Sequence, residues 1–189
     1  RRVPLGQPAD LGRRDRDVPV NRSVIVQGDG TVRVVERAIP GLLPRMALLR
    51  VHSGAVSTGT ETNMIRELRE RPRELDEPWR AGYSAAGIVE EAGEGYSGPP
   101  VGSAVAVYGA PYVCHSDYLA VPQNLMAVTT LALEEAAFGG IGAIAMHGVR
   151  LGHIGLGERV GVLGLGVLGQ IVAQMARTCG AFVIASDPV

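Results

Sequence analysis

Apolar and polar residues alternate with two different periodicities along this chain of 189 residues. As far as about residue 130, apolar residues come in short runs separated by turns rich in glycine and proline, a pattern that predicts strands. The expected strands are residues 23–27, 31–36, 46–52, 85–91, 101–108 and 116–121. Strands this short and closely spaced favour a compact antiparallel domain, a partly open β-barrel.

Three further segments complete this part of the chain. Gly28-Asp29-Gly30 separates the first two strands and is a good hairpin signal. Residues 62–71 have helix-forming composition and end before Pro72, although their charges also suit a solvated surface. Residues 1–22 carry six arginines, three aspartates and three prolines without apolar periodicity, which predicts a mobile tail. A basic interaction arm is the alternative for that tail.

From residue 133 the apolar period becomes helical. Residues 133–150 predict one helix in spite of Gly139, Gly140 and Gly142. We place a domain boundary near Gly140, which divides the chain into a first domain, 23–140, and a second, 141–189.

The second domain opens with a strand, a glycine triplet, a helix and another strand. The apolar run 160–163 predicts a buried strand, residues 167–179 a helix that ends before a glycine, and residues 182–185 a second strand. This order is typical of dinucleotide-binding domains, which are doubly wound α/β folds. The residues expected to bind the dinucleotide are Gly164, Gly166, Val167, Leu168, Gly169 and Asp187.

Each glycine of the triplet has a physical role. Gly164 allows the tight turn, Gly166 lets the backbone approach a pyrophosphate, and Gly169 lets the helix pack close to the strand. The phosphates would then meet the free N–H groups of the first helical turn, where Val167 and Leu168 lie. Asp187 follows Gly164 by 23 residues, close to the spacing of the acid that binds the adenosine ribose. That acid favours NAD over NADP; the alternative is that the glycines serve only a tight turn.

Composition narrows the classes of partner. Eighteen basic and nineteen acidic residues give a net charge of −1, which predicts no general affinity for nucleic acid or membranes. All the basic residues are arginine, a bias that we attribute to a GC-rich bacterial genome. Two cysteines make neither a disulfide framework nor a zinc set, which favours a reducing cytoplasm. A doubly wound domain needs more elements than follow Gly140, so we expect a longer protein.

Several segments together resemble the medium-chain dehydrogenase/reductase superfamily over residues 23–189. They are SGAVSTGTE at 53–61, AGYSAAGIVEEAG at 81–93, VGSAVAVYG at 101–109, HSDYLAVP at 115–122, EEAAFGGIGAIAMHGV at 134–149 and the glycine triplet. The resemblance implies a GroES-like barrel followed by the first part of a Rossmann domain, a nicotinamide cofactor, a small-molecule substrate and a homodimer formed through the nucleotide domain. The S-T-G-T-E and G-Y-S segments are most similar to the branch that contains bacteriochlorophyllide a dehydrogenase.

The chain departs from the zinc-dependent members of this superfamily at their ligand positions. Those members carry Cys-Gly-Thr-Asp where this chain has Thr58-Gly59-Thr60-Glu61, and Gly-His-Glu where it has Gly82-Tyr83-Ser84. Their further ligand falls near Gly139. Threonine, tyrosine and glycine do not reproduce the thiolate and imidazole ligands that zinc prefers, so we expect no catalytic zinc.

Without a metal, hydroxyl groups would have to stabilise charge on a substrate oxygen. The resemblance assigns this role to Tyr83, at the position of the zinc-binding histidine, and to Thr60, which matches a proton-relaying hydroxyl. The alternatives are a tyrosine packed at the domain interface and a threonine that bonds to its own turn. Glu61 either orients this loop, joins the relay or is a plain surface acid, and Thr58 is a weaker candidate.

The other titratable side chains favour structural roles. His115 precedes a predicted strand and His147 lies on the helix at the junction, where histidines are more often structural than catalytic. Cys114 and Cys179 have no neighbour in sequence that would lower a thiol pKa.

These expectations combine into a zinc-independent, NAD-preferring oxidoreductase that interconverts a secondary alcohol and a ketone on an organic, secondary-metabolic substrate. The first alternative is an NADPH-dependent enoyl or quinone reductase. The second is a nucleotide-binding domain of a larger assembly that has no catalytic turnover.

Overall fold

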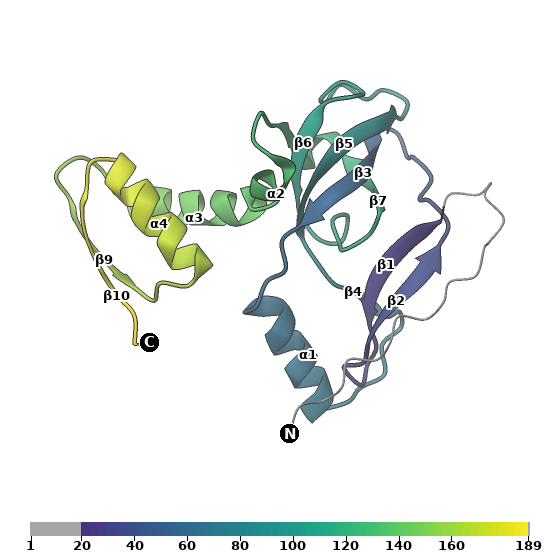
Figure 1. Cartoon of the computed structure of the whole chain (residues 1–189), viewed down its shortest axis with the longest axis horizontal. Coiled ribbons are helices and arrows are strands. Elements are labelled where there is room, and N and C mark those ends of the chain that lie inside the picture. The colour runs from purple at the N-terminus through teal and green to yellow at the C-terminus, as the bar shows by residue number, and fades with distance from the viewer. Residues whose placement is uncertain (1–19, 189) are drawn as a thin grey trace.

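The computed structural model describes residues 20–188, and most of the predicted tail, 1–22, lies outside these residues. Asn21 and Arg22 belong instead to the first strand. In chain order the elements are β1 Asn21–Val26, β2 Val32–Arg37, β3 Met46–Gly54, α1 Thr60–Glu70, β4 Trp79–Arg80, β5 Ser84–Ala92, β6 Ala104–Tyr108, β7 Tyr118–Pro122, the 3₁₀ turn Gln123–Leu125, β8 Met126–Val128, α2 Leu133–Ala136, α3 Gly139–Leu151, β9 Arg159–Leu163, α4 Val167–Thr178 and β10 Phe182–Ser186 (Figure 1).

The first part of the chain is the antiparallel β-domain that the sequence predicts. Five strands form one sheet in the order β7-β3-β5-β6-β8, and three form another in the order β2-β1-β4. All six predicted strands are present, while the short strands β4 and β8 carry too weak a pattern to be predicted. Alternate residues of the large sheet point inward and make a core of alanine, valine and leucine centred on Leu49, Val89 and Val105.

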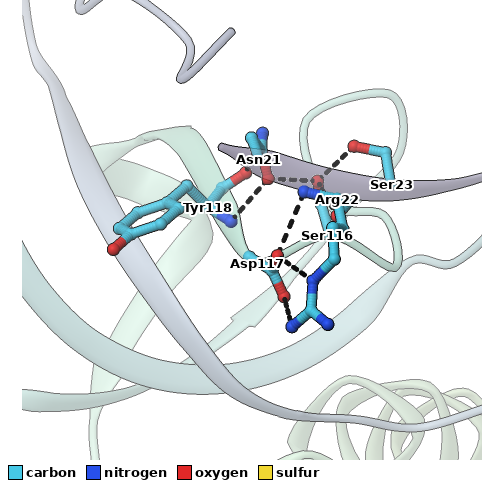
Figure 2. Close-up of polar contacts among 6 residues, drawn as sticks. All are labelled: Asn21, Arg22, Ser23, Ser116, Asp117 and Tyr118. Carbon is cyan, nitrogen blue, oxygen red and sulfur yellow. Dashed lines mark hydrogen bonds and ion pairs between the residues drawn. The ribbon is translucent and has the colours of Figure 1, made fainter. Parts of the chain in front are cut away.

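Polar contacts close the barrel on one side, where β1 lies against the segment that enters β7 (Figure 2). Ser23 and Ser116 form an isolated bridge, and the Ser116 hydroxyl donates to Asn21 Oδ1 at 2.9 Å. The same Asn21 oxygen accepts the Tyr118 N–H at 2.9 Å. Asn21 is 5% exposed, so its carboxamide fixes this seam from inside. The two sheets are therefore joined at one side.

An ion pair covers the same seam from the solvent side. Arg22 Nε donates to Asp117 Oδ2 at 2.8 Å, and the Arg22 backbone N–H donates to the same oxygen at 3.0 Å. The hydrogen bonds from Arg22 lower the pKa of Asp117.

This lowered pKa predicts a small pH dependence of stability. A carboxylate whose pKa is lower in the folded protein stabilises the fold above its unfolded pKa of about 3.9, and the contribution is lost as the pH falls through the folded value. We expect urea unfolding of Asp117→Asn to depend less on pH than that of the wild type below about pH 4. Equal pH dependence in the two proteins would contradict this.

Helix α1 covers the small sheet. Its buried residue Leu68 packs with Val26 and Ala81, and Trp79 packs against the same cluster. The structure thus gives Trp79 a packing role beside α1. The hairpin before it forms as expected, with Asp29 Oδ1 accepting the Thr31 N–H at 2.8 Å and Gly30 at a φ of +75°.

The second part contains a β-α-β unit, β9-α4-β10, which we call the nucleotide unit. Strands β9 and β10 pair in parallel, and α4 connects them. Helix α4 ends because Gly180 adopts a φ of +85° and the Ala181 N–H returns to the Ala176 carbonyl at 3.1 Å. Helix α3 runs from the barrel to this unit and packs against α4 (Figure 1).

The prediction of one continuous helix over 133–150 is wrong, because α2 and α3 are separate helices. Tertiary contacts with Ser84, which is 1% exposed, explain the interruption. The Ser84 hydroxyl donates to the Ala137 carbonyl at 2.6 Å and accepts the Gly140 N–H at 3.1 Å. A Cβ on Gly140 would lie only 2.4 Å from the Tyr108 ring, so glycine is needed for this approach.

We expect Ser84→Ala to destabilise the protein by about 1–3 kcal/mol, since it leaves two buried backbone groups without their partner. Urea unfolding monitored by circular dichroism measures this loss. The exposed Ser97 is the matched control, and Ser97→Ala should change the free energy of unfolding by less than about 0.5 kcal/mol. Equal effects of the two substitutions would show that the α2–α3 contact contributes little.

Within residues 20–188, no helix has the length and apolar character required to cross a bilayer.

Candidate functional site

The turn between β9 and α4 has the geometry that the glycine triplet predicts. Gly164 adopts a φ of +93°, which favours glycine. A Cβ on Gly169 would lie 1.9 Å from the Gly164 carbonyl oxygen, so the helix packs directly on the loop. A Cβ on Gly166 would meet no atom within 4 Å, which leaves open space beside the backbone.

Helix α4 begins directly after Gly166, beside this open space. Gly166 precedes the helix, and the first intrahelical bond runs from the Gln170 N–H to the Gly166 carbonyl at 3.0 Å. The N–H groups of the first turn, where Val167 and Leu168 lie, therefore have no intrahelical partner. With the helix dipole they make a site suited to a phosphate group.

Asp187 lies at the same loop, immediately after β10. Its Oδ2 accepts the Leu165 backbone N–H. The glycine loop and the expected ribose-binding acid are thus adjacent, although 22 residues separate Leu165 from Asp187. The open space beside Gly166, which a Cβ would fill, and the adjacent Asp187 carboxylate fit an adenine dinucleotide.

A second polar cluster lies in the barrel domain, where α1 begins. Glu61 is 3% exposed, so the interpretation of Glu61 as a plain surface acid is wrong. Its Oε1 lies 2.8 Å from His115 Nε2, and its Oε2 accepts the Ser57 backbone N–H. The structure brings Glu61 and His115 together from segments 54 residues apart.

The sequence does not point to Ser57, and it favours a structural over a catalytic role for His115. Nothing local signals the contact between Glu61 and His115, since it depends on how the barrel closes. The sequence shows only that an acid, Glu61, directly precedes the predicted helix 62–71.

Tyr83 lies just before β5 and is half-buried. Its ring packs edge-on to Tyr108, with ring centroids 6.0 Å apart. It also contacts the cluster of Ala55, Ala86, Ala136, Ala137 and Ile141, which joins the barrel to helices α2 and α3. The ring therefore lies at the junction between the two parts of the chain, and its catalytic role remains a prediction.

Thr60 is the first residue of α1 and is exposed. Its backbone N–H donates to the Ser57 hydroxyl at 3.1 Å, so Ser57 closes the turn that precedes the helix. Thr58 is exposed in this turn, and His147 is exposed on α3. The role of each remains a prediction.

The two cysteines differ in their surroundings. Cys114 is buried in the barrel core and Cys179 is exposed. Burial raises the pKa of the Cys114 thiol, while Arg80 and Arg37 act in the opposite direction. Within the described part of the chain, no group of three or more His, Cys, Asp or Glu side chains is placed to hold a metal ion.

No protein-family model matches the sequence. Two curated relatives are the 2-dehydro-3-deoxy-L-galactonate 5-dehydrogenase of Pseudoalteromonas atlantica and the human sorbitol dehydrogenase, each 26% identical. The alignments cover 85% and 86% of this chain and 54% of each relative. The chain therefore spans about half the length of the curated relatives it matches.

Solved structures show the same fold. The quinone oxidoreductase of Coxiella burnetii superposes with a TM-score of 0.75 at 18% identity, over 88% of this chain and 56% of that one. A cobalt- and zinc-bound alcohol dehydrogenase of Pyrobaculum aerophilum gives 0.73 at 26% identity, over 88% and 59%. The CAD protein of Helicobacter pylori, complexed with NADP(H), gives 0.72 at 19%, over 88% and 58%.

These neighbours confirm the predicted combination of a GroES-like barrel with a Rossmann unit. The curated relatives and the Pyrobaculum aerophilum structure are named as dehydrogenases and are 26% identical to this chain, which agrees with its resemblance to the medium-chain dehydrogenase/reductase superfamily.

Proposed function

We propose that this protein is an NAD(H)-preferring oxidoreductase that interconverts a secondary alcohol and a ketone. The observation that carries the proposal is the glycine loop, where Gly166 leaves open space, Gly169 packs on the loop and Asp187 lies alongside. The similarity to proteins named as dehydrogenases supports the same reaction class.

The chain offers a defined set of contacts to a nicotinamide dinucleotide. The N–H groups of the first turn of α4 would hold the pyrophosphate, and Asp187 would bind the ribose hydroxyls. When bound, the nicotinamide supplies or accepts a hydride. A carboxylate at the ribose repels a 2′-phosphate, which is why we propose NAD rather than NADP.

The protein's own side chains would then stabilise the negative charge that develops on the substrate oxygen. We assign the hydrogen bond to that oxygen to the Tyr83 hydroxyl, assisted by the Thr60 hydroxyl at the start of α1. Donors fixed in place before reaction stabilise developing charge without reorganising. The Tyr83 ring is held by Tyr108 and by the junction cluster, so its packing supports such fixed placement.

We also propose that the reaction proceeds without zinc and that the protein belongs near the bacteriochlorophyllide a dehydrogenase branch. By the resemblance, Thr58 and Tyr83 stand at two of the superfamily's zinc-ligand positions and the further position falls near Gly139, and none of these residues is a ligand of the preferred kind. Metal analysis of the purified protein tests this point, and one tightly held zinc per chain would overturn it.

The same resemblance leads us to propose a homodimer formed through the nucleotide domain. Cysteine usage leads us to propose a cytoplasmic location. The sugar-derived names of the curated relatives make polyols the first substrates to try.

Calorimetric titration of the full-length protein with NADH and with NADPH tests the proposal. We expect NADH to bind at least about tenfold more tightly, a difference of about 1.4 kcal/mol. Asp187→Ser should narrow that ratio, because it removes the repulsion of the 2′-phosphate. Preference for NADPH would favour the enoyl or quinone reductase instead. Absence of binding to either dinucleotide would refute the oxidoreductase, and binding without turnover would favour a non-catalytic nucleotide-binding domain.

A further inference from the structure

The turn that leads into α1 is held by a buried carboxylate and an imidazole. We propose that Glu61 and His115 are positioning residues that fix the Ser57–Thr60 turn, and with it the Thr60 hydroxyl, in the active site. The inference rests on the proposed function, since that function makes Thr60 part of the site. It adds a role for His115 that the similarity to other dehydrogenases does not supply.

Glu61 is positioned to act as an anchor because each of its oxygens has a separate partner. Oε1 meets His115 Nε2 at 2.8 Å and Oε2 accepts the Ser57 N–H. The carboxylate side chain is only 4% exposed. A buried carboxylate is tolerated where hydrogen bonds satisfy it, and such bonds are stronger than those between neutral groups.

His115 connects that carboxylate to the rigid barrel. Its backbone N–H donates to the Ala81 carbonyl at 2.7 Å, and its carbonyl accepts the Val24 N–H at 2.8 Å. A Cβ on Gly54 would lie 3.1 Å from His115 Nδ1, so the ring fits closely against a strand that has no side chain there. With both its backbone and its ring fixed, His115 can hold Glu61 in one place.

The turn itself has few other restraints. The Ser57 hydroxyl accepts the Thr60 N–H at 3.1 Å, and the Ser57 carbonyl accepts the Glu61 N–H at 3.2 Å. These are bonds within the turn. Thr58 and Gly59 are exposed, and a Cβ on Gly59 would meet no atom within 4 Å. On its N-terminal side the turn is attached at Ala55, whose N–H donates to the Ser84 carbonyl at 3.0 Å, and beyond that point its position on the barrel depends on the Glu61 carboxylate.

Two pairs of substitutions in the full-length protein test this arrangement. Glu61→Ala and His115→Ala should each lower kcat by about ten- to a hundredfold, because each removes a charge-assisted hydrogen bond that holds the turn. Glu61→Gln and His115→Gln each keep a hydrogen-bonding group in place and should stay within about threefold of the wild type. The affinity for NADH should not change in any of the four. His147→Ala, at an exposed position on α3, is the control.

Hydrogen–deuterium exchange provides a readout that does not depend on activity. We expect His115→Ala to speed deuterium uptake in residues 55–64 and His115→Gln to restore the slow uptake of the wild type. This pair leaves Glu61 in place, so the test holds even where Glu61→Ala does not fold.

The outcomes separate the two proposals. If His115→Gln is as impaired in kcat as His115→Ala while its exchange is that of the wild type, His115 transfers protons itself and the positioning role is refuted. Unchanged exchange in His115→Ala refutes it as well. If the wild type binds no dinucleotide, the proposed function fails, yet the exchange data still decide whether Glu61 and His115 hold the turn.

Discussion

Gly166→Ala is expected to weaken dinucleotide binding by at least about tenfold while leaving the melting temperature unchanged. The new Cβ would enter open space and Gly166 has an ordinary φ of −61°, so the fold has no reason to respond. The same methyl group would occupy the place where a pyrophosphate must approach the backbone. Calorimetric titration with NADH, together with thermal unfolding, measures both effects in one preparation.

Substitutions at two other glycines serve as controls for Gly166→Ala. Gly169→Ala places a Cβ 1.9 Å from the Gly164 carbonyl oxygen. Because this clash is with the backbone, no side chain can move aside to relieve it. We expect this substitution to lower the free energy of unfolding by about 1–3 kcal/mol or more and to abolish NADH binding. Gly161→Ala adds a methyl group in open space on β9 and should alter neither property. Wild-type affinity in Gly166→Ala would show that the loop is only a tight turn.

The local sequence pattern was sufficient to predict the structure wherever residues close in sequence determine it. The hairpin around Asp29 is fixed by a bond to Thr31, two residues away. The end of α4 is fixed by Gly180, whose positive φ few other residues adopt. Strands β6 and β7 alternate between buried and less buried residues along their whole length, so their period of two could be recognised directly in the sequence.

Prediction failed where a distant side chain decides the structure. The break between α2 and α3 is made by Ser84, more than fifty residues away, while the local apolar pattern continues through it. The burial of Glu61 could not be predicted either, because an acid next to threonine in a polar segment is typical of a solvent-exposed position. Its burial depends on His115, and only the closed barrel brings the two together.

The same limit applies to Tyr83, since the structure supports both interpretations of this residue. Its ring packs against Tyr108 and the junction cluster, as an interface residue would. That packing would also fix the hydroxyl of a catalytic residue. Only a substitution that keeps the ring and removes the oxygen distinguishes the two roles.

Tyr83→Phe is therefore expected to lower kcat for secondary alcohols by about 10²–10³, the usual loss for one fixed donor at a charged oxygen. The melting temperature and NADH affinity should stay at wild-type values, because the edge-on contact with Tyr108 needs only the ring. Tyr108→Phe removes the same hydroxyl from the partner ring and should leave kcat unchanged. Steady-state rates of NADH formation with a panel of polyols measure both. A kcat for Tyr83→Phe within twofold of the wild type would make Tyr83 a packing residue and leave Thr60 as the remaining candidate donor.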